Sequence, residues 1–179
     1  TRARYPCAVN MEPTTPHPGA AAPTNMKPQR VLMLGATGTI GRAAVKALVA
    51  RGHTVVCLVR TPAQGASPAL ATGAEARIAD VGDPSSITRD GLRGERFDAM
   101  VSCMASRTGV PADAWAVDHQ AHLHALAAAQ AAGVKHVVLL SALCVQKPKL
   151  AFQQAKLAFE QALMASGLTY SIVRPTALF

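Results

Sequence analysis

The sequence predicts an α/β protein: a doubly wound parallel sheet with helices on both faces. Two observations support this. Short apolar segments alternate with helix-like segments from Val31 onward, and glycines stand just past several of the helix-like segments, at Gly52, Gly133 and Gly167, where helices commonly end. Strands and helices that alternate with short connections are typical of parallel sheets covered by helices.

Six segments have the length and the apolar or β-branched character of buried parallel strands. We expect strands at residues 31–34, 54–59, 74–79, 99–104, 135–140 and 169–173. The segments between them predict helices near 39–50, 84–92, 112–132 and 150–165. The 179 residues, half of them hydrophobic, suffice for one ordinary core.

Residues 1–30 differ in composition from the rest. They contain six of the twelve prolines and no hydrophobic periodicity, so we expect a disordered N-terminal tail. Because the tail is basic and nearly free of acidic residues, it fits part of a transit peptide; translation that begins at Met26 fits equally well. We assign residues 31–179 to one domain that lacks its substrate-binding C-terminal part.

The net charge of +8 raises the question of nucleic-acid binding. The basic residues are scattered and only 4% of residues are aromatic, which argues against a base-stacking surface. No apolar run approaches the roughly 20 residues of a membrane span. Scattered arginines favour a phosphorylated small molecule instead. The cysteines form no C-x-x-C pair; three of them, Cys57, Cys103 and Cys144, fall in apolar runs and are interpreted as buried free thiols.

The sharpest motif is a glycine cluster between the first strand and the first helix. Gly35 permits a tight turn, Gly38 lets the backbone approach a pyrophosphate, and Gly41 lets the helix pack on the sheet. The free N–H groups at the helix start would bind the phosphates. This Rossmann-type arrangement predicts dinucleotide contacts at Gly35, Thr37, Gly38, Thr39, Ile40 and Gly41. The G-x-x-G-x-x-G spacing resembles the extended and atypical branches of the short-chain dehydrogenase/reductase superfamily.

The cofactor is expected to be NADP(H). An NAD site typically has a carboxylate at the end of the second strand, which binds the adenosine ribose hydroxyls. In this chain no Asp or Glu occurs between Glu12 and Glu75. Arg60 ends that strand and Arg42 follows the last glycine, so both can bind a 2′-phosphate. The alternative for Arg60 is a solvated strand end.

Further cofactor contacts follow from the ends of the other strands. Asp80 and Val81 end the third strand, where related reductases hold the adenine ring; Asp80 serves equally well as the N-cap of the next helix. Small residues including Cys103 and Ala105 end the fourth strand, leaving room for the cofactor ribose. The superfamily resemblance also places the backbone of Arg174, Pro175 and Thr176 at the nicotinamide carboxamide.

The superfamily usually has Ser at the end of strand five and Tyr-x-x-x-Lys on the following helix. This chain has Ser141 and Lys156 at those places, but Phe152 replaces the tyrosine. Phe152 and Lys156 share a helical face, so both are expected near the nicotinamide. Phenylalanine cannot protonate an alkoxide, which favours a substrate whose reduction creates none, such as a conjugated carbon–carbon double bond. Core packing of Phe152 and a surface position of Lys156 are the alternatives.

Four longer stretches narrow the resemblance. Residues 102–109, 140–148, 152–157 and 168–176 closely resemble the NADPH-dependent 8-vinyl reductase family of chlorophyll biosynthesis. That resemblance implies reduction of the 8-vinyl group of divinyl chlorophyllide or protochlorophyllide to ethyl, with Lys156 and Ser141 as catalytic residues and a proton donor that the residues do not identify. It implies a chloroplast location in a plant or alga, and the cytoplasm in a photosynthetic bacterium.

Two other functions stay open. Regulators and assembly proteins that resemble NmrA also keep the nucleotide site without the tyrosine, and isoflavone-reductase-like enzymes act on other conjugated alkenes. A metal site at His119, His122 and His124 is disfavoured because these residues do not share one helical face and no cysteine or carboxylate cluster supports them. We expect that helix to cover the sheet, with its histidines at the edges.

Overall fold

A computed structural model describes residues 27–61 and 73–175. The described residues form one six-stranded parallel sheet in the order β3-β2-β1-β4-β5-β6. The strands are β1 (Arg30–Leu34), β2 (Thr54–Val59), β3 (Glu75–Ile78), β4 (Ala99–Ser102), β5 (His136–Leu140) and β6 (Thr169–Val173). The predicted doubly wound sheet is confirmed. The expected tail 1–30 lies mostly outside the described residues.

The strands β1 and β2 are buried along nearly their whole length. Val31 to Leu34 and Val55 to Val59 are buried, as their continuous apolar sequence predicts. In register, Leu34 lies opposite Leu58 on one side and Ser102 on the other. The neighbouring strands β2, β1 and β4 therefore end close together, and the residues that follow them meet at one edge of the sheet.

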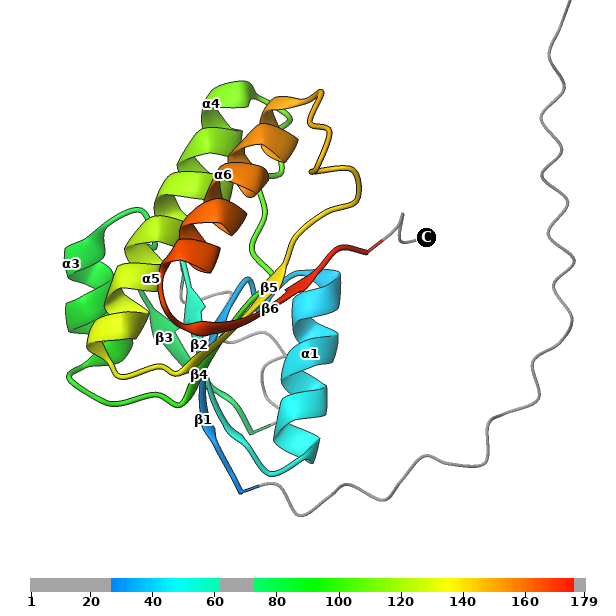
Figure 1. The fold of residues 1–179 in the computed structure, drawn as a ribbon. Coiled ribbons are helices and arrows are strands. Elements are labelled where there is room, and N and C mark those ends of the chain that lie inside the picture. Colours follow the sequence, from blue (N-terminus) through cyan, green and yellow to red (C-terminus); the bar gives the residue numbers. More distant parts are fainter. Residues whose placement is uncertain (1–26, 62–72, 176–179) are drawn as a thin grey trace, which may run out of the picture.

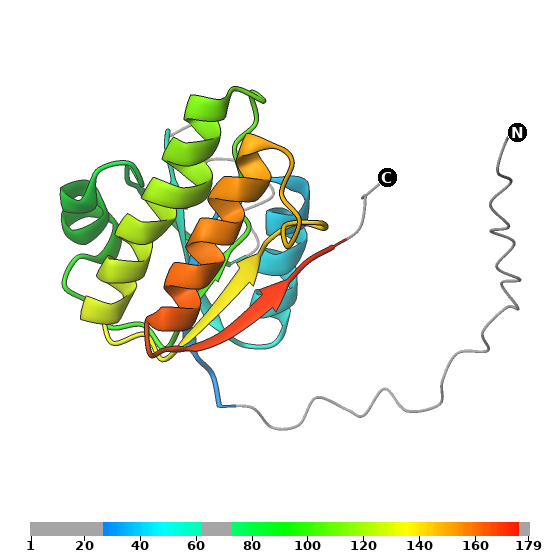
Figure 2. The ribbon, with the colours of Figure 1, turned by 45° about the horizontal axis from the view of Figure 1, so that its top comes forward.

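Helices cover both faces (Figures 1 and 2). One face carries α1 (Thr39–Ala50), which packs through Val45 on Met33, Val55 and Cys57. The other face carries the remaining helices over a larger core that includes Leu32, Val56, Met100, Phe159 and Leu163. These helices are α3 (Pro84–Ser86), η1 (Ile87–Leu92), α4 (Pro111–Ala114), η2 (Trp115–Ala121), α5 (His122–Ala131) and α6 (Ala151–Ala165).

Two predicted helices differ from expectation in their winding. The segments expected near 84–92 and 112–132 are helical, but Ile87–Leu92 and Trp115–Ala121 are π-helices. A π-helix bonds i to i+5 and is wider than an α-helix, and π-turns are frequent at functional sites. The 3.6-residue period of the sequence could not reveal this local widening. Glycines 52, 133 and 167 do follow their helices, each with positive φ.

Most boundaries agree with the sequence within one residue. The exception is β4, which ends at Ser102 and not at 104. Residues from Cys103 onward leave the sheet as a loop, which we call the β4 loop (Cys103–Thr108), and this loop lies across the carboxyl edge. The start of α6 is fixed by Gln153, whose side-chain oxygen accepts the backbone N–H groups of Lys149 and Leu150.

Candidate functional site at the carboxyl edge of the sheet

The three glycines after β1 differ in whether the fold itself requires a glycine at that position. A Cβ at Gly35, which has φ +71°, would lie 2.5 Å from the backbone of Cys103, and one at Gly41 would lie 2.0 Å from the Gly35 carbonyl oxygen. Both glycines are thus needed by the fold itself. A Cβ at Gly38 would meet nothing closer than 3.6 Å. The protein has room for a side chain at Gly38, so its glycine fits a close backbone approach by a ligand.

The start of α1 is open to such a ligand. Gly38 is its N-cap and supplies no side-chain oxygen to the first-turn N–H groups. No acidic residue stands in that turn. Unsatisfied N–H groups and the positive end of the helix suit a pyrophosphate, so the residues present fit the dinucleotide that the sequence predicts.

The first cavity, of about 530 Å³, opens beside this helix start. Its lining combines the glycine turn, the end of β2 and the β4 loop. Of the predicted cofactor residues, it brings together Gly35, Thr37, Gly38, Thr39, Arg60, Cys103 and Ala105. Arg60 is exposed here at the end of β2, and its charge helps to lower the pKa of Asp113, after the larger effect of a hydrogen bond from Thr108.

The other predicted cofactor residues do not line this cavity. Gly41 has its role inside the turn, and Arg42 is exposed on α1 and lines neither cavity described here. Asp80 does not cap the following helix, because that N-cap is Asp83, whose carboxylate accepts the Ser85 N–H. The Asp80 carboxylate instead accepts the Gly82 N–H at 2.8 Å. Adenine contacts at Asp80 and Val81 stay predictions.

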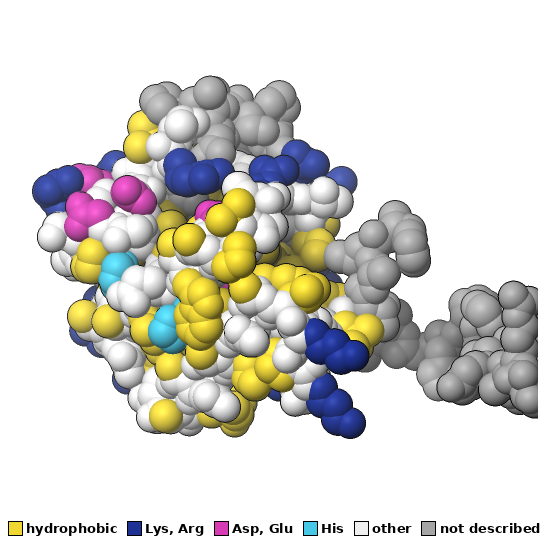
Figure 3. Space-filling view, turned by 90° about the horizontal axis from the view of Figure 1, so that it is seen from above, with side chains coloured by type: hydrophobic (Ala, Val, Ile, Leu, Met, Phe, Trp, Pro, Cys, Tyr) yellow, Lys and Arg dark blue, Asp and Glu magenta, His cyan; other side chains and the backbone are white. Residues whose placement is uncertain are grey.

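The second cavity, of about 630 Å³, adjoins the first and is mainly apolar. Seen from above, hydrophobic side chains occupy much of this end of the molecule, with several Lys and Arg side chains around them (Figure 3). Both cavities share the residues from Cys103 to Arg107 as lining. The second adds Ile40, Leu140, Leu150, Phe152 and Pro175 as apolar lining, and Asp118, Ser141 and Lys156 as polar lining.

Lys156 is buried rather than a surface lysine. Its ammonium lies 2.9 Å from the Asp118 carboxylate, which is fully buried. Phe152 lines the same cavity from one turn earlier on α6 and is half-buried. The predicted shared face of these two residues is therefore present, and the alternative in which Lys156 is solvated is wrong.

Ser141 lies at the end of β5, on the wall of the second cavity. Its backbone N–H donates to Val173, but its hydroxyl oxygen is buried without a hydrogen-bond partner within the described structure. A buried hydroxyl normally has a partner. This oxygen can thus bond a ligand or water in the cavity, as a site residue should.

His122 is wholly buried, so the expectation that the histidines lie at the helix edges is wrong for this one. Its Nδ1 is 2.8 Å from the Val117 carbonyl oxygen, which can only accept. Nε2 is therefore unprotonated and accepts the Ser102 hydroxyl proton at 2.8 Å. Burial, followed by the charge of Lys156, lowers the pKa of His122 to about 4. The imidazole is neutral and holds the end of β4.

No metal centre is formed by the histidines of this helix. His119 packs edge-on against Trp115, and His124 bonds Gln120. Within residues 27–61 and 73–175, no three His, Cys, Asp or Glu side chains gather closely enough to hold a metal ion. In the same part of the chain, no helix is long and apolar enough to cross a membrane.

The end of β6 is tied to α6. The Arg174 guanidinium binds the fully buried Glu160 carboxylate, with Nη2 2.5 Å from Oε2, and Pro175 lines the second cavity. This leaves the Arg174 backbone for the predicted carboxamide contact, which stays a prediction. Thr176 lies outside the described residues.

The cysteines are less uniform than the sequence suggests. Cys57 is buried, and burial raises the pKa of its thiol to about 12. Cys103 is partly buried, with its pKa also raised by burial, so it is no activated nucleophile. Cys144 is exposed in a turn with φ +64°, which corrects its interpretation as a buried strand residue.

Two site residues were missed in the sequence. Arg107 lines both cavities, and Asp118 joins α6 to the β4 loop. The available signal for Asp118 was its spacing of four from His122, which puts both on one helical face. A carboxylate and an imidazole on a face that must cover a sheet indicate a buried polar network.

Comparison with known proteins agrees with the geometry. A family model described as NAD(P)H-binding matches residues 35–179. Divinyl chlorophyllide a 8-vinyl-reductase, chloroplastic, from Oryza sativa subsp. indica is 44% identical over 161 residues, which are 83% of this chain and 40% of the relative. Photosystem II assembly factor Ycf39 from Synechocystis is 32% identical over 146 residues, 81% of this chain and 44% of that protein.

A solved structure of a putative NAD-dependent epimerase/dehydratase from Bacillus halodurans superimposes with a TM-score of 0.72 at 25% identity. The match covers 84% of this chain and 72% of that one. The chain spans less than half the length of the two curated relatives.

Proposed function

The chain belongs to the family of NAD(P)H-binding proteins whose model matches residues 35–179, and we propose that it is the nucleotide-binding part of an NADPH-dependent 8-vinyl reductase. The substrate would be divinyl chlorophyllide or protochlorophyllide, and the product its 8-ethyl form. The observation that carries the proposal is the pair of adjoining cavities, with Phe152 and Lys156 on the wall of the second. The likeness to the rice reductase supports the choice of substrate.

The first cavity would hold NADP(H), with the pyrophosphate at Gly38 and the start of α1 and the 2′-phosphate at Arg60. The bound dinucleotide would supply the hydride, and water or an acid not yet identified would supply the proton that completes the ethyl group. Two features support NADP(H) over NAD(H): the end of β2 offers a guanidinium, and no carboxylate follows this strand until Glu75.

The second cavity would hold the vinyl-bearing edge of the macrocycle against the hydride donor. Its mainly apolar lining suits a large conjugated ring. Phe152 presents a ring where a carbonyl reductase needs a hydroxyl, and vinyl reduction creates no alkoxide that would need a proton. Negative charge spread into the macrocycle would be stabilised by the Lys156 ammonium, and the Ser141 hydroxyl would bond the ligand or a water molecule.

The test is the reaction itself, in the full-length protein. Incubation with NADPH and divinyl chlorophyllide should convert the 8-vinyl group to ethyl, as read by chromatography and absorption of the pigment. Lys156→Ala should lower turnover or weaken NADPH binding, and Arg60→Met should cost affinity for NADPH but not for NADH. Wild-type kinetics in Lys156→Ala would remove this residue from the mechanism.

A second candidate function is assembly or cofactor sensing, which the likeness to the Synechocystis assembly factor favours. Under that function NADPH binds but the pigment stays unchanged in a demonstrably folded protein. The rice relative is named chloroplastic, so we expect the chloroplast if this chain comes from a plant or alga, and the cytoplasm if it comes from a photosynthetic bacterium.

A further inference from the structure

One buried carboxylate at the site has no role in the proposed chemistry so far. We infer that Asp118 is a positioning residue that sets the place of the Lys156 ammonium and of the β4 loop, so that NADPH binding depends on Asp118 through Lys156. This inference rests on the role proposed above for Lys156.

Asp118 divides its two oxygens between two partners. Oδ1 lies 2.9 Å from Lys156 Nζ, while Oδ2 accepts the Ser106 hydroxyl at 2.5 Å. The Ser106 backbone N–H approaches both oxygens at 3.3 Å. One carboxylate thus joins η2, which carries it, to α6 and to the β4 loop, three of the segments that line the second cavity.

Asp118 lies in the π-helix Trp115–Ala121, on the helical face that is turned toward the sheet end. Asp118 and, four residues later, His122 both lie buried against the sheet end. His122 holds Ser102, the last residue of β4, and Asp118 holds Ser106 four residues on. The same face of one helix therefore fixes both the start and the middle of the loop that lines both cavities.

Because both side chains are buried, the ion pair with Asp118 restricts where the Lys156 ammonium can lie. The Asp118 side chain is 0% exposed and that of Lys156 is 7% exposed. A buried ammonium without a counter-charge is strongly disfavoured, so its position follows that of the carboxylate. The remaining ammonium protons can then point into the cavity that Lys156 lines. A merely structural ion pair would stabilise the fold and leave cofactor affinity unchanged.

The test is a double-mutant cycle on NADPH affinity, measured by fluorescence titration of the full-length protein. Asp118→Asn keeps the size of the side chain but leaves Lys156 without its counter-ion, and we expect a dissociation constant raised about tenfold. Lys156→Met should raise it similarly. Because Asp118 acts through Lys156, the double variant should bind no more weakly than Lys156→Met. The inference would be overturned if the double variant raised the dissociation constant by the product of the two single effects. It would also be overturned if Asp118→Asn or Lys156→Met bound NADPH as tightly as the wild type.

The matched control is Glu95→Gln, which removes a carboxylate from buried Arg77 at the opposite edge of the sheet. Its NADPH affinity should be unchanged. If Asp118→Asn does not fold, Asp118→Glu keeps the counter-charge of Lys156 but moves it by one methylene; we expect weaker NADPH binding, with no further loss when it is combined with Lys156→Met, and equal affinity would refute the inference. NADPH binding is measured separately from vinyl reduction. A wild-type protein that leaves the pigment unchanged would therefore refute the proposed function, while the effect of Asp118 on NADPH affinity could still be measured.

Discussion

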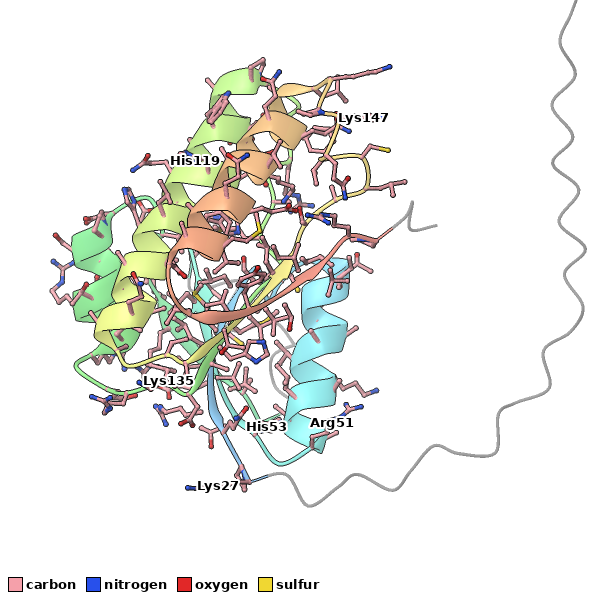
Figure 4. The ribbon with its side chains drawn as sticks, viewed as in Figure 1. Lys27, Arg51, His53, His119, Lys135 and Lys147 are labelled. Carbon is pink, nitrogen blue, oxygen red and sulfur yellow. The ribbon has the colours of Figure 1, made fainter. Side chains whose placement is uncertain are left out.

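The two edges of the sheet both contain buried charges, but they arrange them differently. In the first network, which we call the amino edge because it includes Arg30 at the start of β1, the guanidinium of Arg77 is buried beneath the carboxylates of Glu75 and Glu95, which are 45% and 40% exposed, and Arg30 also binds Glu95. At the carboxyl edge, both partners of the Lys156–Asp118 pair are buried beside two cavities. Figure 4 shows Lys27, Arg51, His53 and Lys135 toward the amino end, with His119 and Lys147 toward the other.

This difference indicates that the charges of the amino edge stabilise the fold, whereas the carboxyl edge has groups that a ligand can bind. The amino-edge network joins β1, β3 and the residue Glu95 before β4, and Arg77 also donates to the Gly91 carbonyl at the end of η1. Its charged groups pair with one another, and within this network only the Nε of Arg30 is buried without a hydrogen-bond partner among the described residues. At the carboxyl edge, the Ser141 hydroxyl has no partner among the described residues, and the first N–H groups of α1 have no side-chain cap. Ligands of open parallel sheets bind at this edge.

The largest effect should come from breaking the amino edge. Arg77→Ala removes the buried guanidinium, opens a cavity and leaves the Gly91 carbonyl without its donor. We expect the free energy of unfolding to fall by about 4 kcal/mol. Urea denaturation measures this, and NADPH affinity below the transition should stay at the wild-type value. A variant with normal stability and weakened NADPH binding would contradict the division between the edges.

The next effect concerns pH at the carboxyl edge. His122 has a pKa of about 4 in the folded protein against an ordinary value of 6.5, so the unfolded chain binds more protons between these values. The contribution of the neutral imidazole to the free energy of unfolding is complete above pH 6.5. It is lost as the pH falls, by about 3 kcal/mol at pH 4. Denaturation at several pH values measures the slope, and His122→Gln should flatten it.

The amino edge should respond to pH in a lower range. The hydrogen bonds from Arg77 hold the pKa values of Glu75 and Glu95 below their ordinary value of 4.5. Their contribution is present above that value and is lost only as the pH falls further. A loss of stability between pH 6.5 and 5 that survives in His122→Gln would assign it to groups other than this imidazole.

The smallest effect on stability should come from Gly38→Ala. The added methyl has room in the protein, so unfolding should change by less than about 1 kcal/mol. The same methyl occupies the space that the pyrophosphate needs, and we expect NADPH affinity to fall about thirtyfold, or about 2 kcal/mol. Titration with NADPH measures this, and unchanged affinity would mean that the dinucleotide does not approach Gly38.

The sequence predicted the sheet well because its strands are continuous apolar runs and its helices end at glycines. It also predicted the turn of Gly35 and Gly41, where backbone sterics allow no other residue. It could not predict the two π-helices, because one extra residue per turn leaves no periodic signature. The Lys156–Asp118 pair is 38 residues apart in the chain, and without its partner the lysine is indistinguishable in sequence from a surface residue.

The loop from Cys103 to Arg107 is a wall common to both cavities. A ligand in one cavity that shifted this wall would change the surface that a ligand in the other cavity meets. Thermodynamic linkage makes this influence reciprocal, so a nucleotide that tightens pigment binding must itself be held more tightly when pigment is present. Under the proposed function, cooperativity between nucleotide and pigment would need only these five shared lining residues and no movement of a domain.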